Sequence, residues 1–282
     1  MSRNAAEIAA EQLAFWNGPG GQGWLASYGR IERAIAEVGA VALAAAAARP
    51  GEQAIDIGCG TGGTTAALAK AVAPDGHVLG VDISQALIDH ARAQNVANAS
   101  FAVGDAAVHP FDGAHHDLVF SRFGVMFFAE PIVAFRNIRR ALKSTGRLVL
   151  LVWRPAQENP WATVPVRAAQ PFLPPQPRPP EDVGQFSFGD RARVEHILAE
   201  AGFGVPRFEP VDRPIWMGAS VADVLAGAGR FGPLARAFAG AEPAAIEKAK
   251  QAIGEAIAAH ERADGVHLPG ACWLVTARPT AG

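Results

Sequence analysis

The stretch Ala54-Ile-Asp-Ile-Gly-Cys-Gly-Thr-Gly-Gly63 decides the fold of this chain. A short apolar run leads into a glycine-rich loop, and a helical run, TTAALAKAVA, follows the loop directly. Glycine lets the backbone turn tightly and come close to a ligand, and the helix beyond the loop begins with free N–H groups. The stretch therefore predicts a strand, a ligand-binding loop and a helix in succession.

The alternation of short apolar runs with helical runs continues to residue 153. Strands separated by helices of about 10–15 residues are typical of a parallel sheet that is buried on both faces. The predicted strands are 53–57, 77–82, 100–104, 117–121 and 147–153, with two later strands at 206–217 and 269–278.

The segments around this pattern have other compositions. Helices are predicted at 5–15 and 31–48, and the sequence between them, from Trp16 to Trp24, contains too much glycine for a helix or a strand. The proline-rich segment 155–180 cannot be a central strand, because proline lacks the N–H that a sheet needs. Aromatic residues flank this segment, so we expect an ordered cap.

Composition excludes several classes of protein. The 25 Lys and Arg residues against 27 Asp and Glu residues argue against a mainly electrostatic nucleic-acid binder. The two cysteines, Cys59 and Cys272, form no disulfide framework and no thiolate metal cluster. No apolar run is long enough for a membrane span, and the first residues do not resemble a secretory signal. A cytoplasmic protein is the expectation.

The glycine loop allows two kinds of nucleotide ligand. Gly58, Gly60 and Gly63 satisfy G-x-G-x-x-G, and Asp82 ends the next strand, where an acid can bind the ribose hydroxyls of NAD. Asp56, however, would repel a pyrophosphate at the strand end, whereas it suits a cationic ligand such as S-adenosylmethionine. Asp56 would then hold the amino-acid end of that ligand, directly or through a water, or it would act only structurally by hydrogen-bonding the loop amides.

Several motifs in order resemble the class I S-adenosylmethionine-dependent methyltransferases. The sequence D-I-G-C-G-T-G at 56–62 resembles their motif I, followed by Asp82 in GVDIS and Asp105 in AVGDAAVHPF. SRFGVMFF at 121–128 resembles the segment under the methionine moiety, and PGACWLVTARP resembles the antiparallel last strand. The resemblance covers roughly 50–155 and is nearest to the branch related to the ubiquinone- and menaquinone-biosynthesis C-methyltransferases.

The resemblance implies an α/β fold with a Rossmann-like, mostly parallel sheet of seven strands in the order 3-2-1-4-5-7-6, the last strand antiparallel. We expect one catalytic domain overall. Its predicted parts are an N-terminal helical lid at 1–48, a core at 49–154 and 191–282 with a helical insertion at about 219–264, and a proline-rich cap at 155–190.

The resemblance also implies S-adenosylmethionine as cofactor and S-adenosylhomocysteine as product. Asp82 would bind the ribose, and Asp105 would bind the adenine amino group with the amide of Ala106. The expected cofactor-binding residues are Tyr28, Asp56, Gly58, Cys59, Gly60, Thr61, Gly62, Asp82, Ile83, Gly104, Asp105, Ala106 and Ser121.

Aromatic residues near the carboxyl ends of the predicted strands are candidates for an acceptor pocket. The substrate-binding candidates are Trp16, Trp24, Arg122, Phe123, Trp153, Asn159, Trp161, Phe186 and Phe188. Arg122 could anchor an anionic acceptor or pair with an acid of the chain. Tyr28 and His109 are the candidate catalytic groups.

Three other histidines are expected on the surface. His77, His115 and His116 immediately precede strands, which places them at the edge opposite to the ligand edge of an open α/β sheet.

The sequence thus predicts methyl transfer to a carbon, oxygen or nitrogen of a small-molecule acceptor by direct in-line displacement in an enclosed site. We expect no nucleic-acid partner, no metal ion, and a monomer or homodimer. Two alternatives remain: an NAD-dependent oxidoreductase and a non-catalytic S-adenosylmethionine-binding protein. The first needs a Tyr-x-x-x-Lys or similar pair, but Glu32 stands four residues after Tyr28.

Overall fold

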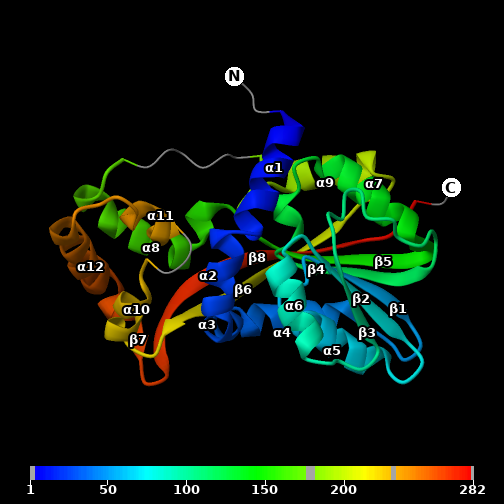
Figure 1. Cartoon of the computed structure of the whole chain (residues 1–282), viewed down its shortest axis with the longest axis horizontal. Helices are drawn as coiled ribbons and strands as arrows, with labels where there is room; N and C mark the ends of the chain where they lie inside the picture. Colours follow the sequence, from blue (N-terminus) through cyan, green and yellow to red (C-terminus); the bar gives the residue numbers. More distant parts are fainter. Residues whose placement is uncertain (1–3, 176–181, 230–232, 281–282) are drawn as a thin grey trace.

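The computed structural model describes residues 4–175, 182–229 and 233–280, and it has a central sheet with helices on both faces (Figure 1). The strands are β1 Gln53–Ile57, β2 His77–Asp82, β3 Ala99–Val103, β4 His116–Arg122, β5 Leu142–Trp153, β6 Arg207–Gly218, β7 Glu261–Arg262 and β8 Gly265–Ala277.

The strand order is β3-β2-β1-β4-β5-β8-β6. Strands β3, β2, β1, β4 and β5 pair in parallel, and β8 runs antiparallel to both β5 and β6. This path confirms the order predicted from the resemblance. The two-residue β7 adds an eighth strand, which pairs with β8 through a tight turn and is too short to leave a sequence pattern.

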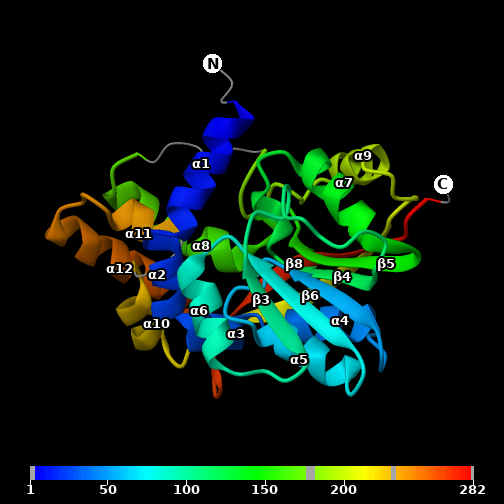
Figure 2. The same cartoon turned by 45° about the vertical axis from the view of Figure 1, so that its right-hand side comes forward.

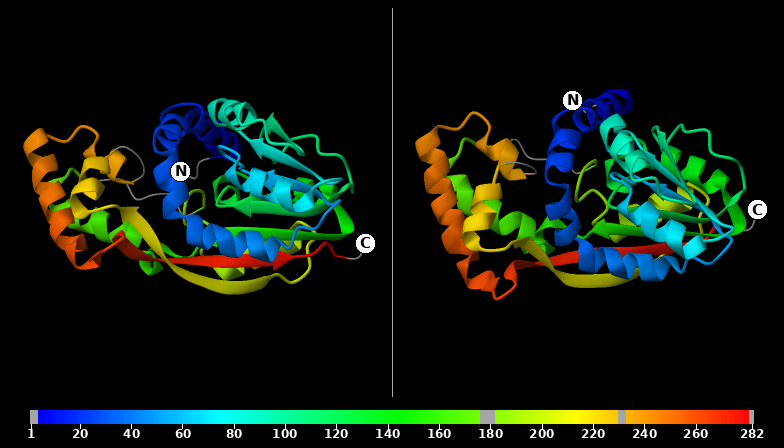
Figure 3. Two further views of the ribbon diagram at one scale, coloured as in Figure 1. Left: turned by 90° about the horizontal axis from the view of Figure 1, so that it is seen from below. Right: turned by 60° about the horizontal axis from the view of Figure 1, so that its bottom comes forward.

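Helices cover both faces of the sheet. Helices α4 (Ala36–Ala46) and α5 (Gly63–Val72) lie on one face, and α7 (Pro131–Ala141) and α9 (Arg191–Glu200) lie on the other (Figures 1 and 3). Burial on both faces explains why the central strands are apolar throughout: Ile55, Val119 and Leu150 are fully buried.

A second hydrophobic cluster lies at the far end of β6 and β8, which extend beyond the rest of the sheet as a long antiparallel pair (Figure 3). Helices α8 (Pro160–Ala169), α10 (Val221–Gly227), α11 (Pro233–Phe238) and α12 (Pro243–Ile257) surround it. Its buried residues are Ala169, Val224, Ala249, Ile253, Ile257, Val266 and Leu268. Part of the predicted cap, residues 176–181, lies outside the described residues.

The N-terminal segment contains α1 (Ala5–Trp16), α2 (Pro19–Ala26) and α3 (Tyr28–Ala34), with α6 (Gln85–Ala93) beside α2 (Figure 2). The expectation that residues 16–24 form neither helix nor strand is therefore wrong. Pro19 starts α2, and a Cβ at Gly20 would overlap the ring of Phe15. These glycines allow α1 and α2 to pack closely, which outweighs their poor helix propensity.

The predicted helix at 31–48 is interrupted at Ile35, where α3 ends and α4 begins. Within the described ranges, no helix has both the length and the apolar character needed to cross a membrane.

Candidate functional site

The glycine loop turns sharply after β1. Gly58, Gly60 and Gly62 have φ angles of 67°, 55° and 86°, which favour glycine. A Cβ at Gly58 would lie 2.6 Å from the Cα of Gly124, in the segment after β4, so no larger residue fits there. At Gly60 the nearest atom to a Cβ is 3.9 Å away, in the indole of Trp24, so this side of the loop is open to a ligand.

Asp56 supports the loop from within the fold. The carboxylate is buried, and its Oδ2 accepts hydrogen bonds from the hydroxyls of Thr64 (2.6 Å) and Thr65 (2.7 Å). Its Oδ1 has no hydrogen-bond partner among the described residues. Burial raises the pKa of Asp56 to about 6, although the two hydroxyls and Arg122 act in the opposite direction.

Two further acids follow β2 and β3. Asp82 accepts a hydrogen bond from the N–H of Gly60 at 2.9 Å and another from the N–H of Ser84 at 2.9 Å, so it joins the loop to the end of β2. Burial raises the pKa of Asp82. Asp105 accepts from the N–H of Ala107 at 2.8 Å. Since β2 and β3 are neighbours, both acids lie at one edge of the sheet.

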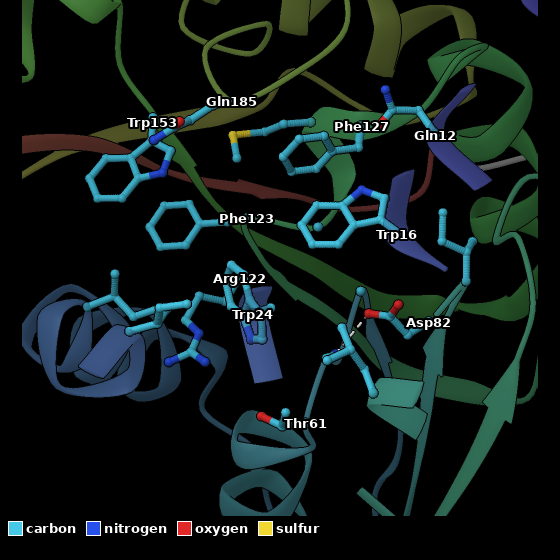
Figure 4. Close-up of a pocket in the computed structure, with 18 of the residues that line it drawn as sticks. Gln12, Trp16, Trp24, Thr61, Asp82, Arg122, Phe123, Phe127, Trp153 and Gln185 are labelled. Atoms are coloured by element: carbon cyan, nitrogen blue, oxygen red, sulfur yellow. Dashed lines mark hydrogen bonds between the residues drawn. The ribbon is translucent and has the colours of Figure 1, made fainter. Parts of the chain in front are cut away.

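A large cavity lies along this carboxyl edge, with a volume of about 950 Å³. Aromatic side chains form much of its wall (Figure 4). The ring of Phe123 stacks on Trp153 with centroids 4.4 Å apart, and Trp16 meets Phe127 edge-on at 5.3 Å. The wall draws on α1, α2, α3, the glycine loop, the end of β4, α8, β6 and α10. The cavity therefore lies between the sheet edge and the segments that the sequence predicted as lid and insertion.

Two ion pairs contribute to the cavity wall. Arg122 donates to both carboxylate oxygens of Glu32, at 3.0 and 2.6 Å. Arg30 donates to Asp223 at 2.8 Å and lies over the ring of Trp216. The sequence allowed Arg122 either to anchor an anionic acceptor or to pair with an acid of the chain. In this structure it pairs with Glu32.

Most of the predicted site residues line this one cavity. They are Trp16, Trp24, Gly58, Cys59, Gly60, Thr61, Asp82, Ile83, Gly104, Asp105, Ala106, Arg122, Phe123, Trp153 and Trp161. They come from the N-terminal helices, the ends of β1, β2, β3, β4 and β5, and α8, so the fold assembles them from segments that are distant in sequence.

The two candidate catalytic groups do not line the cavity. The ring of Tyr28 lies beside that of His90 on α6, with centroids 5.3 Å apart. The ring of His109 packs on Phe111 at 4.7 Å, and burial lowers its pKa. Both side chains therefore pack against neighbouring rings outside the cavity wall.

Six other predicted residues also lie outside the cavity wall: Asp56, Gly62, Ser121, Asn159, Phe186 and Phe188. Ser121 donates its hydroxyl to the carbonyl of Ile57 at 2.8 Å and so ties β4 to β1. Asn159 is fully buried, and its amide exchanges two hydrogen bonds with the backbone of Ala271, at 3.1 and 2.9 Å.

The two phenylalanines pack into the apolar core. Phe188 is 1% exposed and packs against Phe135, and Phe186 is partly buried against the same cluster. Gln185, the residue before Phe186, lines the cavity instead.

One expectation for the histidines is wrong. His116 is buried, with its Nδ1 3.2 Å from the carbonyl of Ala141, and burial lowers its pKa. The turn before β4 folds back on the end of α7, which covers this ring. His77 and His115 are exposed, as predicted. Across the described residues, no cluster of His, Cys, Asp or Glu could hold a metal ion.

The sequence reasoning missed several wall residues from remote segments, among them Arg30, Glu32, Met217, Asp223 and Gln185. None of them belongs to a motif. Only the tertiary packing of α3, β6, α10 and the loop before α9 around the sheet edge brings them to the cavity.

Comparison with known proteins identifies the domain. Residues 55–150 match the family model described as a methyltransferase domain. An uncharacterized 37.1 kDa protein in a transposon of Streptomyces fradiae is 38% identical over 112 residues, which is 39% of this chain and 32% of that protein. The demethylmenaquinone methyltransferase of Staphylococcus carnosus is 34% identical over 120 residues, which is 42% of this chain and 47% of the enzyme. The chain thus spans less than half the length of these two relatives.

Solved structures share the fold. The YcgJ protein of Bacillus subtilis has a TM-score of 0.57 at 18% identity, covering 87% of this chain and 99% of that one. A putative methyltransferase of Bacillus halodurans has a TM-score of 0.57 at 19% identity, covering 86% and 99%. Residues 55–150 constitute a methyltransferase domain of the class I S-adenosylmethionine-dependent type. Over about 120 residues, this part of the chain is similar to the demethylmenaquinone methyltransferases.

Proposed function

We propose that this protein transfers the methyl group of S-adenosylmethionine to a small-molecule acceptor. The observation that carries the proposal is that Asp82, Asp105 and the open side of Gly60 line one cavity at the carboxyl edge of the sheet. Ligands of open α/β sheets bind at this edge. The demethylmenaquinone methyltransferases, which share the domain, support the same reaction class.

The residues present suit the proposed cofactor. Asp82 is placed to take the ribose hydroxyls and Asp105 the adenine amino group, because the two acids end neighbouring strands beside the loop. Asp56 would act through the loop, since its carboxylate binds Thr64 and Thr65 beneath it. No phosphate-binding cation is needed for this ligand, and the buried acid favours a cationic one over a pyrophosphate.

The cavity has room for an acceptor beside the cofactor. Ligand pockets usually measure about 300–1,000 Å³, and this cavity lies near the upper end of that range. The stacked pair of Phe123 and Trp153, together with Trp161, offers a flat apolar surface to an acceptor. A chain of nucleic acid or protein fits such a wall less well than a small molecule does.

We propose that the chain contributes alignment and exclusion of water rather than a base from Tyr28 or His109, which lie outside the cavity wall. When bound, S-adenosylmethionine supplies a methyl group on a positively charged sulfur. The aromatic wall would hold the acceptor in line with that bond and keep the site dry, and such positioning can supply much of a rate enhancement.

The test is transfer of radiolabelled methyl groups from S-adenosylmethionine to quinols, phenols, amines and lipid headgroups. Labelled product with one acceptor class, abolished by Asp82→Asn, would support the proposal. Binding of S-adenosylmethionine without any transfer would favour a non-catalytic binding protein. Preferential binding of NAD would favour the oxidoreductase alternative.

A further inference from the structure

The part of the cavity wall that α1 supplies is apolar except at one residue. Its other wall residues are alanines, Leu13 and Trp16, whereas Gln12 contributes an amide. The Oε1 of Gln12 is buried and accepts no hydrogen bond from any described residue. A buried carbonyl oxygen without a donor costs free energy, because it has lost water and found no replacement. The amide therefore points to a partner that arrives with a ligand.

Helix α1 holds this amide in place. Gln12 stands one turn before Trp16, so the two side chains lie on the same side of the helix. The end of the helix is fixed to the segment after β2: Ser84 donates its hydroxyl to the carbonyl of Trp16 at 2.8 Å, and Asn17 donates to the carbonyl of Ile83 at 2.9 Å. The position of the amide is therefore set before a ligand binds.

Figure 4 shows where Gln12 lies relative to the glycine loop. Thr61 of the loop is on one side of the cavity, and Gln12 is on the other, beside the ring of Phe127. Phe127 in turn meets Trp16 edge-on at 5.3 Å. The amide thus stands among aromatic rings and away from the loop, which is the part of the cavity left for an acceptor.

The charged side chains of the wall favour an uncharged acceptor. Arg30 and Arg122 are both paired with acids of the chain, and Asp82 and Asp105 are the acids proposed for the cofactor. Glu130 is exposed to water, which screens its charge. Among the described residues, no lysine or histidine lines the cavity. A charged acceptor would therefore lose its hydration without gaining a buried counterion.

We propose that Gln12 selects the acceptor: its amide accepts a hydrogen bond from a hydroxyl or N–H group of an uncharged, flat ring compound. This assignment rests on the proposed function. The donor group of the acceptor binds the buried Oε1 of Gln12, while the aromatic rings of the wall cover the faces of its ring. An analogue without the donor leaves that oxygen unpaired, and a site of this kind discriminates strongly against such an analogue.

The test is equilibrium dialysis of 2-naphthol and of its methyl ether, 2-methoxynaphthalene, against the full chain saturated with S-adenosylhomocysteine. Both probes are flat and uncharged, but only the naphthol donates a hydrogen bond. The measured quantity is the ratio of the naphthol affinity to the ether affinity. Gln12→Leu should lower this ratio by about five- to a hundredfold, the usual effect of leaving a buried polar group without its partner.

The matched control is Gln22→Leu, the same substitution on α2. Gln22 is exposed and does not line the cavity, so this variant should keep the wild-type ratio. Two further measurements separate acceptor binding from other roles of Gln12. In Gln12→Leu, the affinity for S-adenosylhomocysteine should stay within about threefold of wild type. The midpoint of urea unfolding should not fall, because the buried oxygen has no partner to lose.

The proposal is overturned if Gln12→Leu keeps the wild-type ratio, or if wild type saturated with S-adenosylhomocysteine binds neither probe. It is also overturned if Gln12→Leu loses affinity for S-adenosylhomocysteine, which indicates a contact with the cofactor instead. Should Gln12→Leu fail to fold, Gln12→Met, which is closer in shape, replaces it with the same expected ratio. Failure of wild type to bind S-adenosylhomocysteine would overturn the proposed function itself.

Discussion

The two edges of the sheet carry the same kinds of residues with different surroundings. Each has a conspicuous aspartate, Asp82 at the carboxyl edge and Asp117 at the amino edge, and each has a close Arg–Glu pair. At the amino edge the charges are tied to the fold: Asp117 accepts from Lys143 at 2.8 Å and from the N–H of Gln53 at 3.0 Å. At the carboxyl edge they line a cavity.

The pKa values of the aspartates shift in opposite directions at the two edges. Burial raises the pKa of Asp56 and of Asp82, so the fold disfavours their charged forms. At the amino edge, burial also tends to raise the pKa of Asp117. The hydrogen bonds and positive charges of its partners outweigh burial, so the pKa of Asp117 is lowered. The fold therefore disfavours the charged forms of Asp56 and Asp82, whereas it favours the charged form of Asp117.

The largest effect that we expect is that of Asp82→Asn on the affinity for the cofactor. Loss of the charge that would bind two ribose hydroxyls should weaken S-adenosylhomocysteine by about a hundredfold. Stability at neutral pH should not fall, because burial already disfavours the charged form. Calorimetry and urea unfolding measure the two quantities. Retained affinity would remove Asp82 from the ribose role.

Asp56→Asn tests the difference between the two edges through the pH dependence of the unfolding free energy. A raised folded-state pKa means that the stabilising contribution is present below the unfolded pKa of about 3.9 and is lost as pH rises through about 6. Relative to Asp56→Asn, wild type should therefore lose about 2–3 kcal/mol of unfolding free energy between pH 4 and pH 7, roughly two pKa units. Parallel stability curves for the two proteins would contradict the assignment.

Asp117→Asn is the matched change at the amino edge, where we expect the opposite dependence of stability on pH. A lowered pKa means that the contribution is present above the unfolded value and is lost as pH falls through the folded one. The variant should be about 1 kcal/mol less stable than wild type at neutral pH, and the gap should close below about pH 4. Affinity for S-adenosylhomocysteine should stay unchanged, and a loss of binding would count against separate roles for the two edges.

The smallest effect concerns backbone strain at the carboxyl edge. Phe123 has a φ of 66°, which a residue with a Cβ rarely adopts, while its ring stacks on Trp153. Both Phe123→Gly and Phe123→Ala lose the stacking, but only glycine relieves the strain. Urea unfolding should show the glycine variant to be about 1 kcal/mol more stable than the alanine variant. The reverse order would mean that the site stores no such strain.

The sequence predicts the parts of the molecule whose interactions are local. The strands and the glycine loop follow from short patterns, and Asp82 and Asp105 follow from their places at strand ends. Helix α2 could not be predicted, since the fit of Gly20 against Phe15 depends on tertiary packing. Asn159 lies at the expected edge, but its partner Ala271 is 112 residues away in the chain.

The acceptor end of the cavity shows the same limit. Its wall includes Met217 and Gln185, which come from two remote segments without a motif. The cofactor end is built from one compact stretch, so its pattern is visible in the sequence, whereas the acceptor end exists only after folding.

Calorimetric titration of the purified chain with S-adenosylhomocysteine and, separately, with NAD tests directly which nucleotide the cavity binds. We expect S-adenosylhomocysteine to bind at one site per chain and NAD to show no comparable affinity. Preferential binding of NAD, or no binding of S-adenosylhomocysteine, would contradict it.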